Sequence, residues 1–472
     1  MRQMKGIIAG LLFAWLPVLG SPQGPTSETL DLSRAIQMAL AKNRTLAQSA
    51  LGTSIGVLDI VRAETAFKLD VRPELYLDAE GGQTVAGGGL SASKKLPWGT
   101  RMSVQGLMAG ASGDGSSLRQ KTLLVEISQP LFRNFGTLIQ EEPVIQARHN
   151  YRTSLRALEI QKDAVALRVV ESYESILQLE RQVLVEQASA ARMEKLVRLA
   201  RAKEVLGRTT RVDTLRAELL RGQAQFRLES IRERLSFEQR DFAELLGAKP
   251  DAVFDLKPTV LLEVNVPPLE EALRTALQNR LDYAQALQDG ADAARGVRIA
   301  GRSLIPGLNL VARKSWTAGD SLVAASTPFN QWSVGLSLDM SLNRKEERAA
   351  LEQALLYGSS ADLSTGIVEL AIAREVNQQR AAYRRAQAEL KIAERNKDLA
   401  ASRRKLAQHL FELGRSDQFS VTDAEETFLL AENQWLAARA EASLAGYRFL
   451  HILGTLIETP DDLKPGSVSE DR

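Results

Sequence analysis

The chain has 472 residues, a formal net charge of +2 and no cysteine. The lack of cysteine excludes a disulfide framework, thiolate metal sites and a lipid anchor on an N-terminal cysteine, and the near-balanced charge gives no sign of a nucleic-acid surface. Aromatic residues make up only 5% of the chain, whereas Ala, Leu, Arg, Glu and Gln are abundant. This composition favours helical packing over an all-β fold.

Residues 1–20 have the pattern of a signal peptide. Arg2 and Lys5 form a basic start, and an apolar run covers residues 6–19 before small residues at the expected cleavage site. The alternative is an N-terminal membrane anchor, but the run is short for a span of about 20 residues. We therefore expect export from the cytoplasm. No later run is long enough for a transmembrane helix, so a membrane segment of the mature chain would have to consist of strands.

Residues 21–247 are predicted to form a first repeat. Amphipathic helices come first, and the period of apolar residues then changes from 3.6 to 2 in a β region at 73–131. A long helix is expected at 137–206, because apolar residues recur there at seven-residue spacing and the segment contains no glycine. At 1.5 Å per residue this helix would extend about 100 Å. After a tip, a shorter helix is expected at 210–246.

The same order recurs after a proline-containing connector at 248–268, so residues 269–457 are predicted to form a second repeat. Its expected parts are a β region at 306–342, a long helix at 343–413, a tip and a helix at 418–454. The β region of the first repeat is longer by roughly twenty residues, and glycine-rich stretches at 81–89 and 110–115 separate its strand candidates. The polar tail at 458–472 is expected to be disordered.

The last strand candidate of the second repeat alternates strictly between apolar and polar residues. Its apolar face consists of Trp332, Val334, Leu336, Leu338 and Met340. This alternation over about ten residues is typical of a transmembrane barrel strand with lipid on one side and water on the other. A soluble sheet with one face on a core gives the same pattern, but the export signal favours the membrane. About four strands per chain are expected, too few to close a barrel, so three chains would share twelve strands.

Three features together make the chain similar to the TolC-like outer-membrane efflux protein family, the outer membrane factors. They are the paired repeats, the segments Pro73-x-Leu-x-Leu and Gln129-Pro130-Leu131, and two Leu-Gly-Arg tips. The resemblance implies a mixed fold of long antiparallel α-helical hairpins, forming a coiled-coil tunnel, and transmembrane β-strands in a barrel shared by a homotrimer. It also implies a channel in the outer membrane of a Gram-negative bacterium with a periplasmic extension.

The function implied by the resemblance is that of an exit duct for a tripartite efflux pump or a type I secretion system. Its partners would be a periplasmic adaptor, an inner-membrane transporter of the RND or ABC type, and outer-membrane lipid. The tips that would meet the adaptor are Leu206, Gly207, Arg208, Leu413, Gly414 and Arg415. Each glycine also has a purely structural reading, as the C-terminal turn of a helix.

The resemblance places the gate of the periplasmic mouth just after the tips. Asp423 falls on its acidic position, Ser420 stands at the preceding acidic position, and Asp213 follows the first tip. Three Asp423 carboxylates would attract cations, although arginines near the tips oppose this. A structural reading also exists here, because carboxylates in the first turn of a helix stabilise its dipole.

The sequence offers no sign of an enzyme. The three histidines, His149, His409 and His451, lack metal-ligand spacing, and neither a phosphate-binding loop nor a nucleophile elbow is present. We therefore expect no catalysis, metal or cofactor. The alternative function is a periplasmic adaptor with a long α-hairpin. An adaptor should have one hairpin flanked by its own β domains rather than two complete repeats.

Overall fold

The computed structural model describes residues 28–80, 83–113, 116–207, 209–319, 329–413 and 415–469. The expected signal peptide lies outside these ranges. The chain divides into two compact units, one of residues 1–39 and 172–260 and the other of residues 40–171 and 261–472. None of the helices in the described ranges combines the length and the hydropathy of a membrane span.

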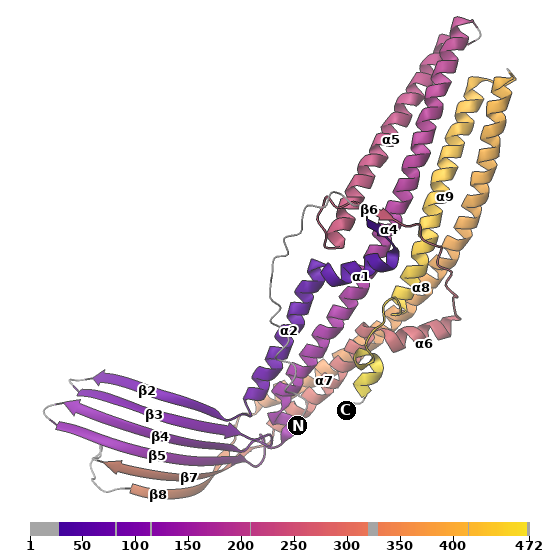
Figure 1. Cartoon of the computed structure of the whole chain (residues 1–472). Helices are drawn as coiled ribbons and strands as arrows, with labels where there is room; N and C mark the ends of the chain where they lie inside the picture. Colours follow the sequence, from indigo (N-terminus) through magenta and orange to yellow (C-terminus); the bar gives the residue numbers. More distant parts are fainter. Residues whose placement is uncertain are drawn as a thin grey trace. The chain divides into compact units, whose positions relative to one another are not determined.

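Helices dominate the structure (Figure 1). In chain order they are α1 (Leu32–Lys42), α2 (Arg44–Thr65), α3 (Thr137–Gln140), α4 (Glu142–Val205), α5 (Arg211–Leu245), α6 (Leu269–Asn279), α7 (Leu281–Ser303), α8 (Lys345–Glu412) and α9 (Gln418–Ile452). The two longest helices, α4 and α8, have 64 and 68 residues. The short helix α3 is separate from α4, so the long helix begins a few residues later than predicted. Pro143 lies in the first turn of α4, where no backbone N–H donor is needed.

The first unit is built around Tyr173. A two-stranded parallel sheet pairs β1 (Glu28–Leu30) with β6 (Phe254–Leu256). The Tyr173 hydroxyl lies within hydrogen-bonding distance of two carbonyl oxygens, 2.9 Å from that of Leu30 and 2.7 Å from that of Lys257. The Tyr173 ring packs edge-on against Phe242 at a centroid distance of 6.1 Å. Burial raises the pKa of Tyr173 to about 12, so this hydroxyl remains a hydrogen-bond donor at physiological pH.

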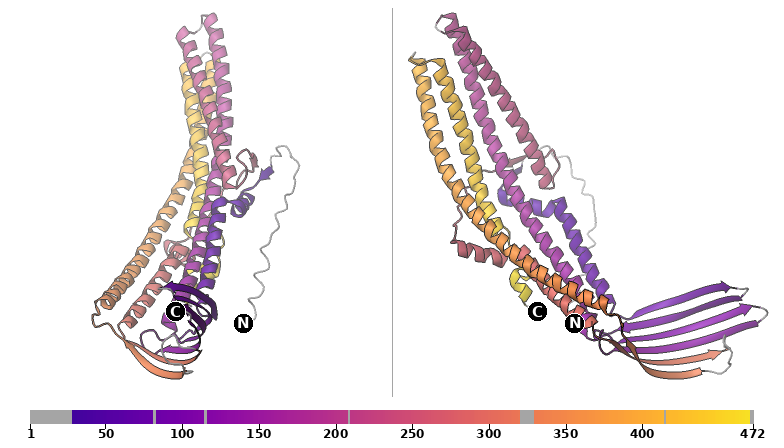
Figure 2. Two further views of the ribbon diagram at one scale, coloured as in Figure 1. Left: turned by 90° about the vertical axis from the view of Figure 1, so that its left-hand side faces the viewer. Right: turned by 180° about the vertical axis from the view of Figure 1, so that it is seen from behind.

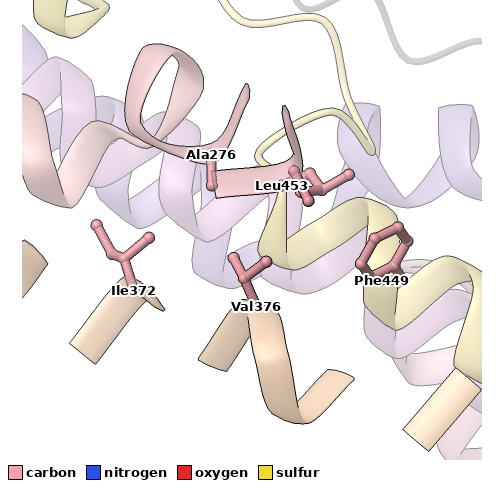
Figure 3. Close-up of a cluster of buried hydrophobic side chains, with 6 residues drawn as sticks. Ala276, Ile372, Val376, Phe449 and Leu453 are labelled. Carbon is pink, nitrogen blue, oxygen red and sulfur yellow. The ribbon is translucent and has the colours of Figure 1, made fainter. Parts of the chain in front are cut away.

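The second unit has a core where α6, α8 and α9 meet (Figure 3). Its buried members are Ala272, Ala276, Ile372, Val376, Phe449 and Leu453. The two alanines bring α6 close to α8, and Phe449 from α9 provides the largest side chain of the cluster. Removal of this apolar area from water stabilises the helical hairpin α8–α9 against α6.

The prediction of a disordered tail is wrong for residues 461–469. They form two short 3₁₀ helices, η1 (Asp461–Leu463) and η2 (Pro465–Ser469). Leu463 is 4% exposed, and its carbonyl accepts a hydrogen bond of 3.1 Å from Nε of Arg156, which is itself only 2% exposed. The polar composition of the tail predicts that the loss of conformational entropy keeps it disordered. Burial of two apolar side chains, Leu463 and Val468, offsets this loss.

The second unit also carries a six-stranded antiparallel sheet in the order β2-β3-β4-β5-β7-β8 (Figure 1; Figure 2). The strands are β2 (Asp70–Glu80), β3 (Gln83–Lys95), β4 (Arg101–Gly113), β5 (Ser116–Pro130), β7 (Gly307–Gly319) and β8 (Phe329–Asp339). The prediction of about four strands per chain is therefore wrong. The additional residues of the first β region form the hairpin β3–β4, because residues 83–89 and 110–113 of the glycine-rich stretches that read as separators lie inside strands.

Candidate membrane-facing sheet and helical tips

One face of the six-stranded sheet is largely apolar from edge to edge, with three lysines, Lys94, Lys121 and Lys314, among its apolar side chains. Residues paired across antiparallel strands lie on the same face, so the pairs Leu310–Leu336, Ala312–Ile127 and Leu90–Gly106 link this face through the sheet. Its exposed large side chains are Val71, Leu75, Leu77, Leu90, Met102, Val104, Met108, Leu123, Ile127, Leu310, Trp316, Trp332, Val334, Leu336 and Leu338. Apolar patches of this extent are unusual on the surfaces of soluble monomers and indicate a contact with lipid or protein.

The apolar strand predicted from the sequence lies at one edge of this face. Trp332, Leu336 and Leu338 on β8 are 70%, 67% and 66% exposed, and Met340 follows one residue after the strand ends. Side chains of a soluble sheet that packed on its own core would be buried. The exposed fractions therefore argue against the soluble-sheet alternative.

The opposite face of the sheet is polar, and its side chains bind one another. Glu74 accepts hydrogen bonds from Ser91 (3.0 Å) and from Gln105 (3.2 Å) across three neighbouring strands. Arg313 on β7 forms an ion pair of 2.6 Å with Glu126 on β5. A sheet with one apolar and one hydrogen-bonded polar face suits a wall between lipid and water.

Both edges of the sheet are open in the single chain. β2 and β8 are the terminal strands, and within the described residues each pairs on one side only. Free strand edges carry unpaired N–H and C=O groups, which soluble proteins cover or shorten. Here both edge strands have 11 residues, so they are suited to pair with another chain.

The first tip is held by a helix cap. Gly207 has a positive φ of 65° at the C-terminal turn of α4, a conformation that glycine adopts without strain. Thr210 caps α5 through a capping box, in which the Asp213 backbone N–H donates to the Thr210 hydroxyl and the Thr210 N–H donates to the Asp213 carboxylate. The hydroxyl of Thr210 also donates to this carboxylate at 2.6 Å. Leu206 is exposed, and Arg208 lies outside the described residues.

The hydrogen bond from the Thr210 side chain is the main reason why the pKa of Asp213 lies below its ordinary value of 3.8; the Thr210 backbone N–H and the Thr209 hydroxyl lower it further. A lowered carboxyl pKa stabilises the folded tip above pH 3.8. This contribution is lost as the pH falls below 3.8 and through the lowered native pKa. Asp213 therefore has a structural role at the first tip, as part of the capping box of α5.

Replacing Thr210 with alanine should loosen the first turn of α5. Loss of an N-cap hydroxyl costs about 1 kcal/mol, so we expect the amide hydrogens of this turn to exchange roughly five times faster, and the pKa of Asp213 to rise towards its ordinary value. Hydrogen exchange and an NMR titration measure the two effects. Thr210→Ser keeps the hydroxyl and should change neither. Equal exchange in T210A and the wild type would contradict the capping role.

At the second tip, the basic residue Arg403 lies beside Asp423, the residue expected at the gate. Asp417 caps α9 by accepting hydrogen bonds from the backbone N–H (2.9 Å) and the hydroxyl (2.6 Å) of Ser420. The Asp423 carboxylate forms an ion pair with Arg403 of α8, and Arg403 also donates to the Thr427 hydroxyl at 3.1 Å. Leu413 is exposed, as is Arg415, whereas Gly414 lies outside the described residues.

Sequence reasoning missed Arg403, although a signal was available. Arg403 and Asp423 stand ten residues before and ten residues after Leu413. In an antiparallel helical hairpin, residues at equal distances from the tip lie opposite each other, so an Arg–Asp pair at this spacing predicts an ion pair. The two side chains are 54% and 44% exposed, so solvent screens their attraction.

Comparison with known proteins agrees with these features. Residues 272–455 match the family model described as outer membrane efflux protein, and no curated protein matches the chain. The structure is similar to that of the outer-membrane channel OprN, with a TM-score of 0.71 at 17% identity over 90% of each chain. It is also similar to the outer membrane protein VceC of Vibrio cholerae, with a TM-score of 0.69 at 15% identity over 90% of this chain and 96% of that one.

A third match is the CmeC outer membrane channel of Campylobacter jejuni, with a TM-score of 0.70 at 12% identity over 93% of this chain and 89% of that one. At these identities the structural matches show the fold. By sequence over residues 272–455 and by fold over most of its length, the chain resembles the TolC-like outer-membrane efflux protein family, as its sequence predicts.

Proposed function

We propose that the chain is a passive exit duct of the outer membrane, in which three copies pool their sheets into one closed barrel. The observation that carries this proposal is an exposed apolar sheet face between two open strand edges. A barrel leaves neither the apolar face nor the strand edges exposed to water, because lipid covers the apolar face and the strand edges of neighbouring chains pair with each other. The polar face then lines a water-filled path.

Strand direction permits this closure. Successive strands of the sheet are antiparallel, and an even number of strands makes β8 run opposite to β2. The β8 edge of one chain is therefore able to pair antiparallel with the β2 edge of the next chain. In this assembly the helical hairpins α4–α5 and α8–α9 of the duplicated halves continue the path through the periplasm as a tunnel.

The duct would work with a periplasmic adaptor and an inner-membrane transporter, for an efflux pump or a type I secretion system. The adaptor would dock on the tips around Gly207 and Leu413. The duct itself would catalyse no reaction and hold no cofactor, because the transporter supplies the work. The adaptor alternative gains no support, since a long exposed apolar sheet face would serve no purpose in a periplasmic protein.

Membrane fractionation tests the proposed function. We expect the mature protein only in outer-membrane detergent extracts, as a trimer that resists sodium dodecyl sulfate until it is heated. A monomer or dimer released with the soluble periplasmic proteins would contradict the duct and restore the adaptor alternative.

We also propose that Asp423 and Arg403 lie at the periplasmic constriction as neutralised pairs, one from each chain. Replacing Arg403 with alanine would leave the Asp423 carboxylates uncompensated, so single channels in a bilayer should become more cation-selective. Asp423→Ala should shift selectivity towards anions, because Arg403 then stands alone. The reversal potential in a salt gradient measures both. The same reversal potential in both variants and the wild type would remove the pair from the constriction.

A further inference from the structure

We infer that the hairpin β3–β4 is a built-in part of the membrane wall, so that the trimer closes an eighteen-stranded barrel rather than a twelve-stranded one. The outer mouth is then wide enough to admit hydrated polymers that a twelve-stranded mouth excludes. This inference rests on the proposed function. It changes the width of the duct at its outer end and therefore the size class of solute that this end accepts.

The hairpin β3–β4 is paired on both sides. β3 pairs with β2 from Asp70–Ser93 to Glu80–Gln83, and β4 pairs with β5 from Arg101–Ser128 to Gly113–Ser116. These ladders run without interruption along all of β2 and along β5 as far as Ser128. A loop that folds over the end of a barrel would leave β2 and β5 paired with each other. Here the hairpin separates them.

Side chains of β2 are fitted to the glycines of β3. Leu75 lies opposite Gly88, where an added Cβ would approach the Leu75 side chain to 2.7 Å. The Tyr76 ring lies directly over Gly87, in the space that a Cβ would need. Large residues that cover cross-strand glycines fix the register of a sheet. The glycine run of β3 therefore packs as strand and not as a flexible linker.

The turn between β3 and β4 is anchored at the base of the sheet. Gly99 in this turn has a φ of 104°, and a Cβ there would meet the Pro130 ring at 2.7 Å. The Trp98 carbonyl accepts a hydrogen bond of 3.1 Å from the Gly136 backbone N–H. The hydroxyl of Thr100, a residue that is 8% exposed, donates a hydrogen bond to the side-chain carbonyl of Gln129 at the end of β5. The hairpin is thus attached at the point where the sheet joins the helices.

Both faces of the sheet continue across the hairpin. Leu90, Val104 and Met108 extend the apolar face, and they are 56%, 43% and 61% exposed. Gln105 extends the polar face, where it donates to Glu74 of β2. A strand pair with one face suited to lipid and the other to water fits within the wall and would be poorly solvated outside it.

The diameter of a barrel grows roughly in proportion to its number of strands. With strands about 4.8 Å apart and tilted by about 40°, twelve strands give a backbone diameter of about 24 Å and eighteen give about 36 Å. Side chains of similar length line both, so the free width increases by at least about half. Barrels of 16–18 strands are wide enough to hold an aqueous channel.

Polymer exclusion measures this width. The matched variant lacks residues 81–115, so that β2 would pair with β5 directly and each chain keeps four strands. Polyethylene glycols of increasing size are added to the barrel side of single channels in a bilayer, and the largest polymer that lowers the conductance is recorded. We expect a cut-off radius at least about 1.5-fold larger for the wild type than for the variant.

Equal cut-off radii for the two trimers would overturn the inference. Electron cryo-microscopy of the wild-type trimer needs no variant and should show eighteen strands in the wall, whereas a wall of twelve strands, built by three chains or by two, would overturn it. These outcomes are distinct from failure of the proposed function, in which the wild type would form no membrane oligomer at all.

Discussion

Replacing Leu336 with arginine should remove the heat-modifiable trimer from the outer membrane. Leu336 lies near the middle of β8 and is 67% exposed on the apolar face. An arginine that faces lipid near the midplane of the bilayer costs about 2–4 kcal/mol. The proposed trimer would carry three copies, and the resulting penalty of about 6–12 kcal/mol is comparable to the whole stability of a typical protein.

The neighbouring residue provides the control. Ser337 lies on the polar face of the same strand, so Ser337→Arg adds the same side chain at the same depth on the side of the proposed water-filled path. We expect near-normal amounts of the S337R trimer in the outer membrane. Comparison of the two variants by fractionation and gel electrophoresis without heating measures the effect. Equal trimer yields for both would contradict the assignment of the faces.

Replacing Phe449 with alanine should produce a large loss of stability where α6, α8 and α9 meet. Phe449 is fully buried in the cluster that it forms with Ala276, Ile372 and Val376 (Figure 3), and loss of a buried phenylalanine side chain costs about 3–5 kcal/mol. We expect hydrogen exchange of the α6 and α8 amides to increase by a factor of at least about 100, since each 1.4 kcal/mol corresponds to a factor of ten.

The conservative variant Phe449→Leu retains most of the volume and should cost less than about 1.5 kcal/mol. Its exchange rates should therefore lie much closer to those of the wild type. If α6 and α8 exchanged at the same rate in F449A as in the wild type, this cluster would not be what holds the three helices together.

Features that depend on periodicity could be predicted from the sequence. The seven-residue spacing in the long helix marks Val169, Ile176 and Val197, which are 0–1% exposed. The strict alternation that begins at residue 331 predicts a strand, and β8 covers Phe329–Asp339. Both patterns are local, and each has one dominant physical cause, the separation of apolar from polar side chains. The presence of long helices and antiparallel strands is confirmed.

Features that depend on contacts between distant residues could not be predicted in this way. Glycine carries no hydrophobic signal, so the strand nature of β3 appears only where Tyr76 covers Gly87. The tail is ordered by Arg156, a residue about 300 positions earlier, through the Leu463 carbonyl. The charge at the expected gate depends on Arg403 as much as on Asp423. In each case the decisive partner lies on another element.

The shared barrel is tested most directly by cross-linking the two open edges of the sheet. The chain has no cysteine, so one cysteine placed in β2 and one placed at successive positions of β8 are the only thiols present. If the chains pool their strands, oxidation in intact outer membranes should give disulfide-linked dimers and trimers at matched positions, and nothing larger. Monomers alone at every position of β8, with the protein present in the membrane, would contradict the account.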